Sequence, residues 1–153
     1  MRKTWIAAIF GFLALAGCAQ IPSFSQPPPP AMSRNGARIF VYRWLEPYES
    51  LEFARVDLDG SPLGYSQNGA AFFRDVAPGP HTITVVSRGR FPGQTETVTL
   101  RPNETLYVRI ASLSSWDPYF PDETFTIRLA DSASGAGDIA SLPLVSGWGW
   151  SHP

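Results

Sequence analysis

The 153-residue sequence contains one cysteine, Cys18, and two histidines, His81 and His152. A single thiol cannot form an internal disulfide, and two histidines far apart in the chain supply no zinc ligand set of their own. Neither histidine stands in a pattern typical of a hydrolytic triad. The sequence also lacks a phosphate-binding loop, a dinucleotide fingerprint and a metalloprotease motif, so it indicates no cofactor and no metal site.

The sequence also has no large excess of basic or of acidic residues. Twelve basic and 13 acidic residues give a formal net charge of −1. No basic stripe is present, and a nucleic acid is therefore not expected as a partner. Long apolar runs are also absent, because the longest, from Trp5 to Ala16, has about a dozen residues and a membrane-spanning helix needs roughly 20.

The amino-terminal segment has the organisation of an export signal. Arg2 and Lys3 form a positive region, and the short apolar run follows them. The polar, proline-rich sequence behind the run offers no stop-transfer segment. We therefore expect residues 1–17 to be a signal peptide that is cleaved, which would lower the formal charge of the mature chain to −3 because Arg2 and Lys3 leave with it.

The end of this segment, Leu15-Ala16-Gly17-Cys18, resembles the lipobox of bacterial lipoproteins. The resemblance implies transfer of diacylglycerol to the Cys18 thiol, cleavage before Cys18, and acylation of the new amino terminus by a fatty acid such as palmitate. Several acyl chains hold a protein firmly to membrane lipid, since each buried methylene contributes about 0.8 kcal/mol. The alternative is a conventional signal peptide that happens to end beside a free or buried cysteine.

The residue after Cys18 indicates the membrane to which a lipoprotein is anchored. In lipoproteins of this kind the absence of Asp at that position goes with the outer membrane, and here the residue is Ala19. The resemblance thus implies a protein of the cell envelope, anchored by lipid to the outer membrane and facing the periplasm.

Composition divides the remaining chain into three parts. Residues 18–36 contain four consecutive prolines, Pro27–Pro30, and are expected to form a lipidated, semi-rigid proline-rich tether. Residues 37–131 form the expected β-domain. Residues 132–153 are small and glycine-rich before they become aromatic at Trp148 and Trp150, and we expect this tail to be poorly ordered at least as far as Gly137.

The central segment has the pattern of short strands joined by tight turns. Apolar and polar residues alternate, as from Phe53 to Asp59, and turn signals such as Asp59-Gly60 and Asn68-Gly69 separate the runs. The expected strands cover residues 38–43, 53–59, 62–65, 70–76, 81–87, 94–100, 105–111 and 123–130. Seven or eight short strands without sustained helical periodicity predict an all-β fold, a small antiparallel β-sandwich.

Three blocks of this segment, Val56–Gly64, Pro78–Ile83 and Asn103–Arg109, resemble the turn motifs of PEGA-like domains, which have a prealbumin-like sandwich. The similarity covers residues 37–112 and looks closest to a bacterial lipoprotein domain of unknown function that shares this plan. The resemblance implies a small envelope sandwich that binds or spaces. It carries over no catalytic residues, because turn motifs indicate a fold rather than a chemistry.

Aromatic side chains concentrate in the expected loops, where side chains reach solvent and rings are preferred anchors of binding sites. Five of them form the candidate binding patch: Trp44, Tyr48, Trp116, Tyr119 and Phe120. Two interpretations stay open. The rings plug the open ends of the sandwich as additional core, or they bind a glycan or another protein of the envelope.

Support for catalysis is confined to the loop carboxylates Asp117, Asp122 and Glu123. These three, and separately Asp57 with Asp59, are also possible oxygen clusters for calcium. Solvated carboxylates in loops are the more ordinary interpretation, because calcium sites need clustered oxygens and acid–base catalysis needs a specific partner. The expected function is a non-catalytic binding or assembly module that is not an enzyme. The alternatives are an envelope hydrolase that uses the loop carboxylates near Trp116 and a purely structural spacer.

Overall fold

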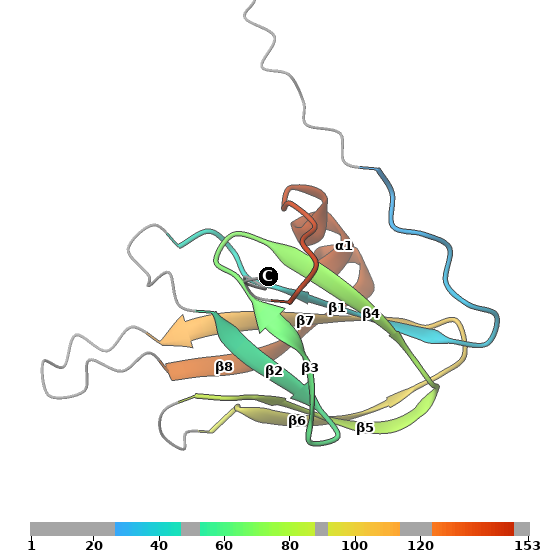
Figure 1. Ribbon diagram of the computed structural model, residues 1–153, viewed down its shortest axis with the longest axis horizontal. Helices are drawn as coiled ribbons and strands as arrows, with labels where there is room; N and C mark the ends of the chain where they lie inside the picture. Colours follow the sequence, from blue (N-terminus) through green and yellow to red (C-terminus); the bar gives the residue numbers. More distant parts are fainter. Residues whose placement is uncertain (1–26, 47–52, 88–91, 114–123, 149–153) are drawn as a thin grey trace, which may run out of the picture.

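The computed structural model describes residues 27–46, 53–87, 92–113 and 124–148. In these ranges eight strands form two four-stranded sheets that pack face to face (Figure 1), which confirms the all-β sandwich. The strands are β1 (Ala37–Tyr42), β2 (Ala54–Leu58), β3 (Ser61–Ser66), β4 (Ala71–Val76), β5 (Gly79–Val85), β6 (Thr95–Leu100), β7 (Thr105–Leu113) and β8 (Thr124–Ala130). The first sheet has the order β4-β1-β7-β8 and the second has the order β3-β2-β5-β6.

The β2–β3 hairpin forms where its turn signal predicts it. Asp59 and Gly60 have φ angles of 52° and 78°, the left-handed conformation that a tight two-residue hairpin turn requires. A register shift between Val56 and Asp57 adds a bulge to the same hairpin. The local sequence therefore indicates this reversal correctly.

The core lies between the sheets and is built from alternate residues of the strands. Ile39 and Val41 of β1 face Val56 of β2 and Ile83 of β5, and Val108 of β7 completes the centre. All five side chains are fully buried. Burial of each such side chain contributes about 1.5–3 kcal/mol, so packing of this layer supplies the main stabilisation of a domain without disulfides.

Strand β1 is buried on both faces, as expected for a central strand. On the outer face of the first sheet, the ring of Phe40 lies 5.4 Å from that of Phe73 and 5.6 Å from that of Tyr107, measured between ring centroids. A further layer must cover these rings, because aromatic side chains on the outer face of the sheet would otherwise be exposed to solvent.

One pairing departs from the expected antiparallel arrangement. β1 and β7 run parallel, with Ile39 beside Leu106 and Tyr42 beside Arg109. The first sheet is therefore mixed, while the second is antiparallel throughout. Alternation along a strand reports which face is buried and says nothing about which strand lies beside it, so the sequence carried no signal for this pair.

The expectation of a poorly ordered tail is wrong. Residues Ser132–Ala140 form helix α1, which begins at the cap Asp131. The Asp131 carboxylate accepts the Ser134 hydroxyl and the backbone N–H groups of Ser134 and Ala133, and these hydrogen bonds lower the pKa of Asp131. A capped helix therefore starts directly after β8.

Helix α1 is the layer that covers the outer face of the first sheet (Figure 1). Gly135 is the buried residue of the helix and lies against the ring of Tyr107, where a Cβ atom would overlap that ring. The Tyr42 hydroxyl donates a hydrogen bond of 2.7 Å to Asp138, and burial together with this bond raises the pKa of Tyr42. Small residues in the helix thus permit close packing, and one polar bond fixes its position.

Residues 143–147 continue from the helix along the edges of β4 and β3. Ala71 donates its N–H to the carbonyl of Pro143 and accepts the N–H of Val145, and Tyr65 donates to the carbonyl of Gly147. The Val145 side chain packs against the core. The folded unit therefore extends to residue 148 and does not end at 131 as expected.

The described part of the tether begins beside helix α1, with Pro27, Pro28 and Pro30 exposed. Pro27, Pro28 and Pro29 face the carboxyl-terminal half of α1 and the residues that follow it.

Candidate functional site

The parallel pairing of β1 and β7 brings the carboxyl-terminal ends of both strands to one end of the sandwich. Tyr42 at the end of β1 lies beside Arg109, and β7 then continues in the same direction to Leu113. Both strands therefore end on the same side of the domain, which we call the loop end. Four residues of the candidate patch fall outside the described residues: Tyr48, Trp116, Tyr119 and Phe120.

Trp44 is the member of the patch that the structure places. Its side chain is 45% exposed, and the guanidinium carbon of Arg109 lies 4.0 Å from the centroid of its ring. Such cation–π contact restricts the ring without burying it. The next residue, Leu45, is 69% exposed. Trp44 therefore does not plug the core, and one face of the loop end offers a positioned, partly solvent-exposed indole.

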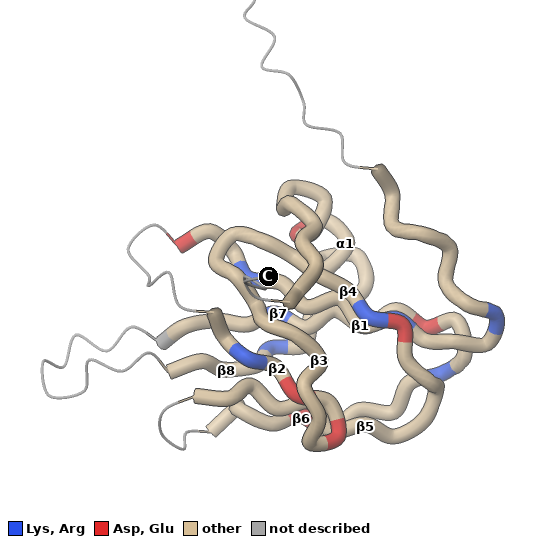
Figure 2. Tube along the Cα trace, in the orientation of Figure 1, with Lys and Arg blue, Asp and Glu red and all other residues tan. Residues whose placement is uncertain are grey.

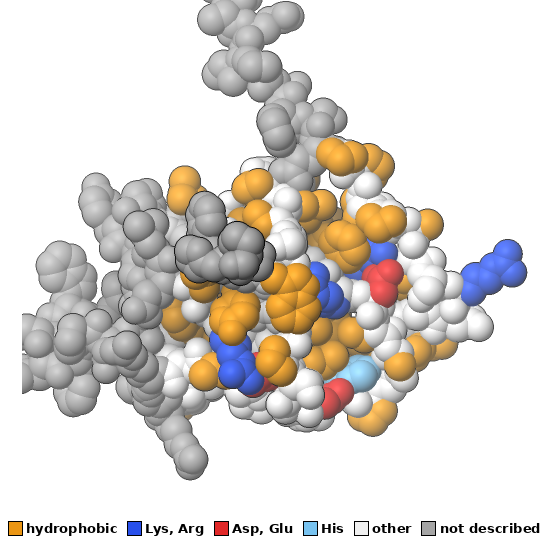
Figure 3. All heavy atoms as spheres, viewed as in Figure 1, with side chains coloured by type: hydrophobic (Ala, Val, Ile, Leu, Met, Phe, Trp, Pro, Cys, Tyr) orange, Lys and Arg blue, Asp and Glu red, His pale blue; other side chains and the backbone are white. Residues whose placement is uncertain are grey.

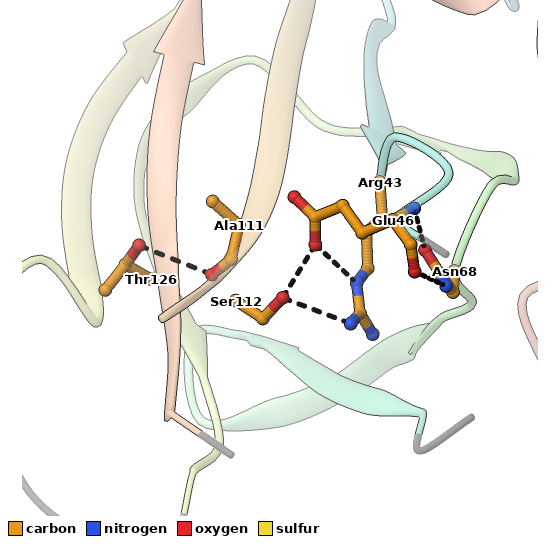
Figure 4. A network of polar contacts seen from close by, with 6 residues as sticks. All are labelled: Arg43, Glu46, Asn68, Ala111, Ser112 and Thr126. Atoms are coloured by element: carbon orange, nitrogen blue, oxygen red, sulfur yellow. Dashed lines mark hydrogen bonds and ion pairs between the residues drawn. The ribbon is translucent and has the colours of Figure 1, made fainter. Parts of the chain in front are cut away.

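The backbone before and after Trp44 is held by the buried side chain of Arg43 (Figure 4). Arg43 is fully buried, its Nη2 donates to Ser112 Oγ at 3.2 Å, and its Nε lies 3.8 Å from Glu46 Oε2. Ser112 Oγ in turn donates to Glu46 Oε2 at 2.7 Å. The Arg43 guanidinium also lies 5.0 Å from the ring centroid of Phe125. A buried charge needs such partners, and their geometry fixes the side chain.

Asn68, in the turn that connects β3 to β4, completes the network (Figure 4). Its amide accepts the N–H of Glu46 at 3.0 Å and donates to the carbonyl of Glu46 at 2.9 Å. The contacts of Arg43 and Glu46 therefore hold residues 43–46 at both ends, and Trp44 lies between these two residues. Sequence reasoning missed Arg43, Glu46 and Ser112. The available signal was an arginine that directly continues a strand apolar on both faces.

The acidic candidates in the described residues have structural partners. Asp57 accepts two hydrogen bonds from Arg55, at 2.7 and 3.0 Å. Asp59 is bound by His81 and by the N–H of Thr82. Within the described ranges no group of three or more metal-ligating side chains is present. Asp117, Asp122 and Glu123 lie outside those ranges.

His81 joins two turns. Its Nδ1 lies 2.7 Å from Asp59 Oδ2 and its Nε2 lies 2.8 Å from the carbonyl oxygen of Ala77. Both neighbours are acceptors, so the doubly protonated ring satisfies both. The hydrogen bonds to Asp59 and Ala77 raise the pKa of His81, and those from Thr82 and His81 lower the pKa of Asp59. This geometry describes a structural clasp between turns.

A second exposed indole lies on the face over β3 and β4, where hydrophobic side chains gather beside basic ones (Figure 3). Trp148 is 52% exposed, and the Arg74 guanidinium lies 4.8 Å from its ring centroid and 5.3 Å from that of Phe72. Charges of both signs are spread over the described chain (Figure 2), so neither aromatic site lies in a field of one sign.

The lipobox residues Leu15, Ala16, Gly17 and Cys18 lie outside the described residues. In the part of the chain that is described, no helix is long and apolar enough to cross a membrane. The sequence matches no protein-family model, and no curated protein is significantly similar to it.

Proposed function

We propose that the protein is a lipid-anchored lipoprotein of the cell envelope whose β-sandwich acts as a non-catalytic binding or assembly module. The anchor is argued from the sequence: a positive segment, a short apolar run and Leu15-Ala16-Gly17-Cys18 follow one another in register. The acyl chains on Cys18 would insert into the outer membrane, and the head would face the periplasm.

The observation that carries the binding role is the fixed, partly exposed ring of Trp44. Arg43 and Glu46 hold the backbone on both sides of it, and Arg109 restricts the indole. A preorganised ring loses little conformational freedom on binding, and aromatic rings dominate the energetics of interfaces. The partner proposed is an envelope glycan or another envelope protein that contacts this ring at the loop end.

The test compares Trp44→Ala with Trp148→Ala, because both residues are exposed indoles held by an arginine. Partners are recovered by crosslinking in intact cells and by co-sedimentation with isolated peptidoglycan. Loss of an interface anchor costs about 2 kcal/mol, so Trp44→Ala should lower recovery roughly thirtyfold while Trp148→Ala leaves it near the wild-type level. Equal recovery with the two variants would remove Trp44 from the proposed binding surface.

A further inference from the structure

Each of the two sheets has two edge strands, and other parts of the described chain bond to three of these four edges. Residues 143–147 form backbone hydrogen bonds with Ala71 of β4 and with Tyr65 of β3. At the edge strand β8, Ile127 donates its N–H to the carbonyl of Gly93. The fourth edge is β6, which within the described ranges pairs with β5 alone.

Alternate residues of β6 point their backbone groups away from β5. The N–H of Val85 donates to the carbonyl of Gln94 at 2.9 Å, so this opposite pair occupies a hydrogen-bonded position of the ladder. Bonded and non-bonded positions alternate along an antiparallel pair of strands. The N–H and carbonyl groups of Thr95, Thr97 and Thr99 therefore point away from β5.

The residues opposite these threonines in β5 agree with this assignment. Pro80 lies opposite Thr99 and has no N–H to donate. Thr82 lies opposite Thr97, and its carbonyl accepts the N–H of Asp59 on the side of β2, away from β6. The outward groups of the three threonines, one N–H and one carbonyl each, have no partner in the described part of the chain.

No feature of β6 prevents another strand from pairing with it. Edge strands are commonly protected by lysine, by proline or by a bulge, and the sequence of β6, Thr-Glu-Thr-Val-Thr-Leu, contains no lysine or proline. Its register with β5 is continuous from Thr95 to Leu100. The side chains of Thr95, Thr97 and Thr99 are exposed, whereas Val98 and Leu100 pack on the core. The strand is thus a regular edge that offers its backbone groups to a further strand.

We propose that β6 pairs with β6 of a second copy of this chain, antiparallel and about a twofold axis at Thr97. In this register Thr97 lies opposite Thr97 of the second copy, and Thr95 lies opposite Thr99. Each of these three pairs exchanges two hydrogen bonds, so together they use all the outward groups of both strands. Cross-strand threonine pairs add to the stability of such a ladder. The second sheets of the two copies become one continuous sheet.

Charge and hydrogen bonding select this register. Glu96 is the only charged residue of β6, and in this register it lies opposite Val98 of the second copy. An axis at Glu96 would set two carboxylates directly opposite each other, which is destabilising. An axis at Val98 would leave Thr95 without a threonine partner. The strand is complementary to itself in one register, and this is the reason to name a second copy as its partner.

Cysteine crosslinking tests the register. The full chain carrying Cys18→Ala is purified with Thr95→Cys, Thr97→Cys or Thr99→Cys and oxidised, so the result depends neither on the lipid anchor nor on the proposed function. Opposite Cα atoms of a hydrogen-bonded pair are about 5.5 Å apart, within the range of about 4.4–6.8 Å that a disulfide needs. The two copies of residue 95, or of residue 99, would lie about 13 Å apart along the strands. Thr97→Cys should therefore yield about tenfold more disulfide-linked dimer than either of the other variants.

Two further arms complete the test. A mixture of the Thr95→Cys and Thr99→Cys chains should form the mixed dimer, and Thr97→Pro in both chains should lower its yield about tenfold, because proline removes an outward N–H that the fold itself does not use. In intact cells, Thr97→Cys in the otherwise native chain should crosslink to a second copy. Equal yields from the three single variants, absence of a dimer with Thr97→Cys, or crosslinking in cells to a different protein would each overturn the proposal.

Discussion

At the scale of single residues, His81 couples the stability of two turns to pH. Its folded-state pKa is raised, so the stability it contributes is fully present below its unfolded value of 6.5 and is lost as pH rises through the folded pKa. The pKa of Asp59 is lowered, so its contribution is present above its unfolded value of 3.8 and is lost as pH falls through the folded pKa. The clasp therefore contributes most between those two values.

The corresponding experiment measures the free energy of unfolding by urea at about pH 5.5 and about pH 8.5 for the wild type and for His81→Gln. The wild type should lose stability relative to the variant as the pH rises, because the imidazolium that bridges Asp59 and Ala77 loses a proton. If the difference between the two proteins is the same at both pH values, His81 does not bind its proton more tightly in the folded state.

The sequence predicts some of the important single residues but not the contacts that they make. Trp44 could be singled out because it belongs, with Tyr48, to the aromatic residues that concentrate in the expected loops. Its partner Arg109 could not, because the contact depends on the parallel pairing of β1 with β7. The role of Arg43 could not be predicted for the same reason, because its partner Ser112 lies in β7.

At the scale of elements, all eight strands could be predicted because each has its own local signal. Alternation marked β2, and the turn residues Asp59 and Gly60 marked its end. Helix α1 had no comparable signal, since it is short, contains two glycines and buries Gly135 instead of a row of large apolar side chains. Packing against the first sheet stabilises this helix, and the local sequence of the helix does not reveal that packing.

The two glycines of α1 supply a matched pair of variants. A Cβ at Gly135 would overlap Tyr107, whereas nothing lies within 4 Å of a Cβ at Gly137. Gly135→Ala should therefore lower the free energy of unfolding by about 1–3 kcal/mol through overpacking. Gly137→Ala should raise it by about 0.5–1 kcal/mol through helix propensity. Urea unfolding of both variants checks this, and a destabilised Gly137→Ala with a neutral Gly135→Ala would contradict the packing of α1 on β7.

The segment after α1 closes the edge of the sandwich between β3 and β4, so deletion of residues 143–153 should expose that edge. The backbone bonds of Ala71 and Tyr65 to this segment would be lost, and Val145 would leave the core. We expect a lower midpoint of thermal unfolding and self-association through the uncovered edge. Light scattering and thermal unfolding measure both effects. Unchanged behaviour would show that the segment does not contribute to the fold.

At the scale of the whole molecule, the tether and the loop end lie at opposite ends of β1. The tether enters at Ala37 and Trp44 follows Tyr42, so a strand of about 20 Å separates them. This arrangement points the loop end away from the point where the tether enters. It suits a head that is held by lipid at one end and meets a partner at the other.

Membrane attachment should depend on one thiol. The Cys18→Ala chain should move from the membrane fraction to the aqueous fraction, because the acyl chains, in which each buried methylene contributes about 0.8 kcal/mol, are then missing. A Ser substitution at the same position should behave identically. Retention of both variants in the membrane fraction would mean that attachment does not depend on acylation of Cys18.

The central claim is the lipid anchor, and mass spectrometry of the amino-terminal peptide of the protein from cell membranes tests it most directly. An acylated Cys18 predicts a peptide that begins at Cys18 and carries the added mass of a diacylglyceryl group and a fatty acid. A peptide that contains unmodified Cys18, or an amino terminus at any other residue, would contradict it.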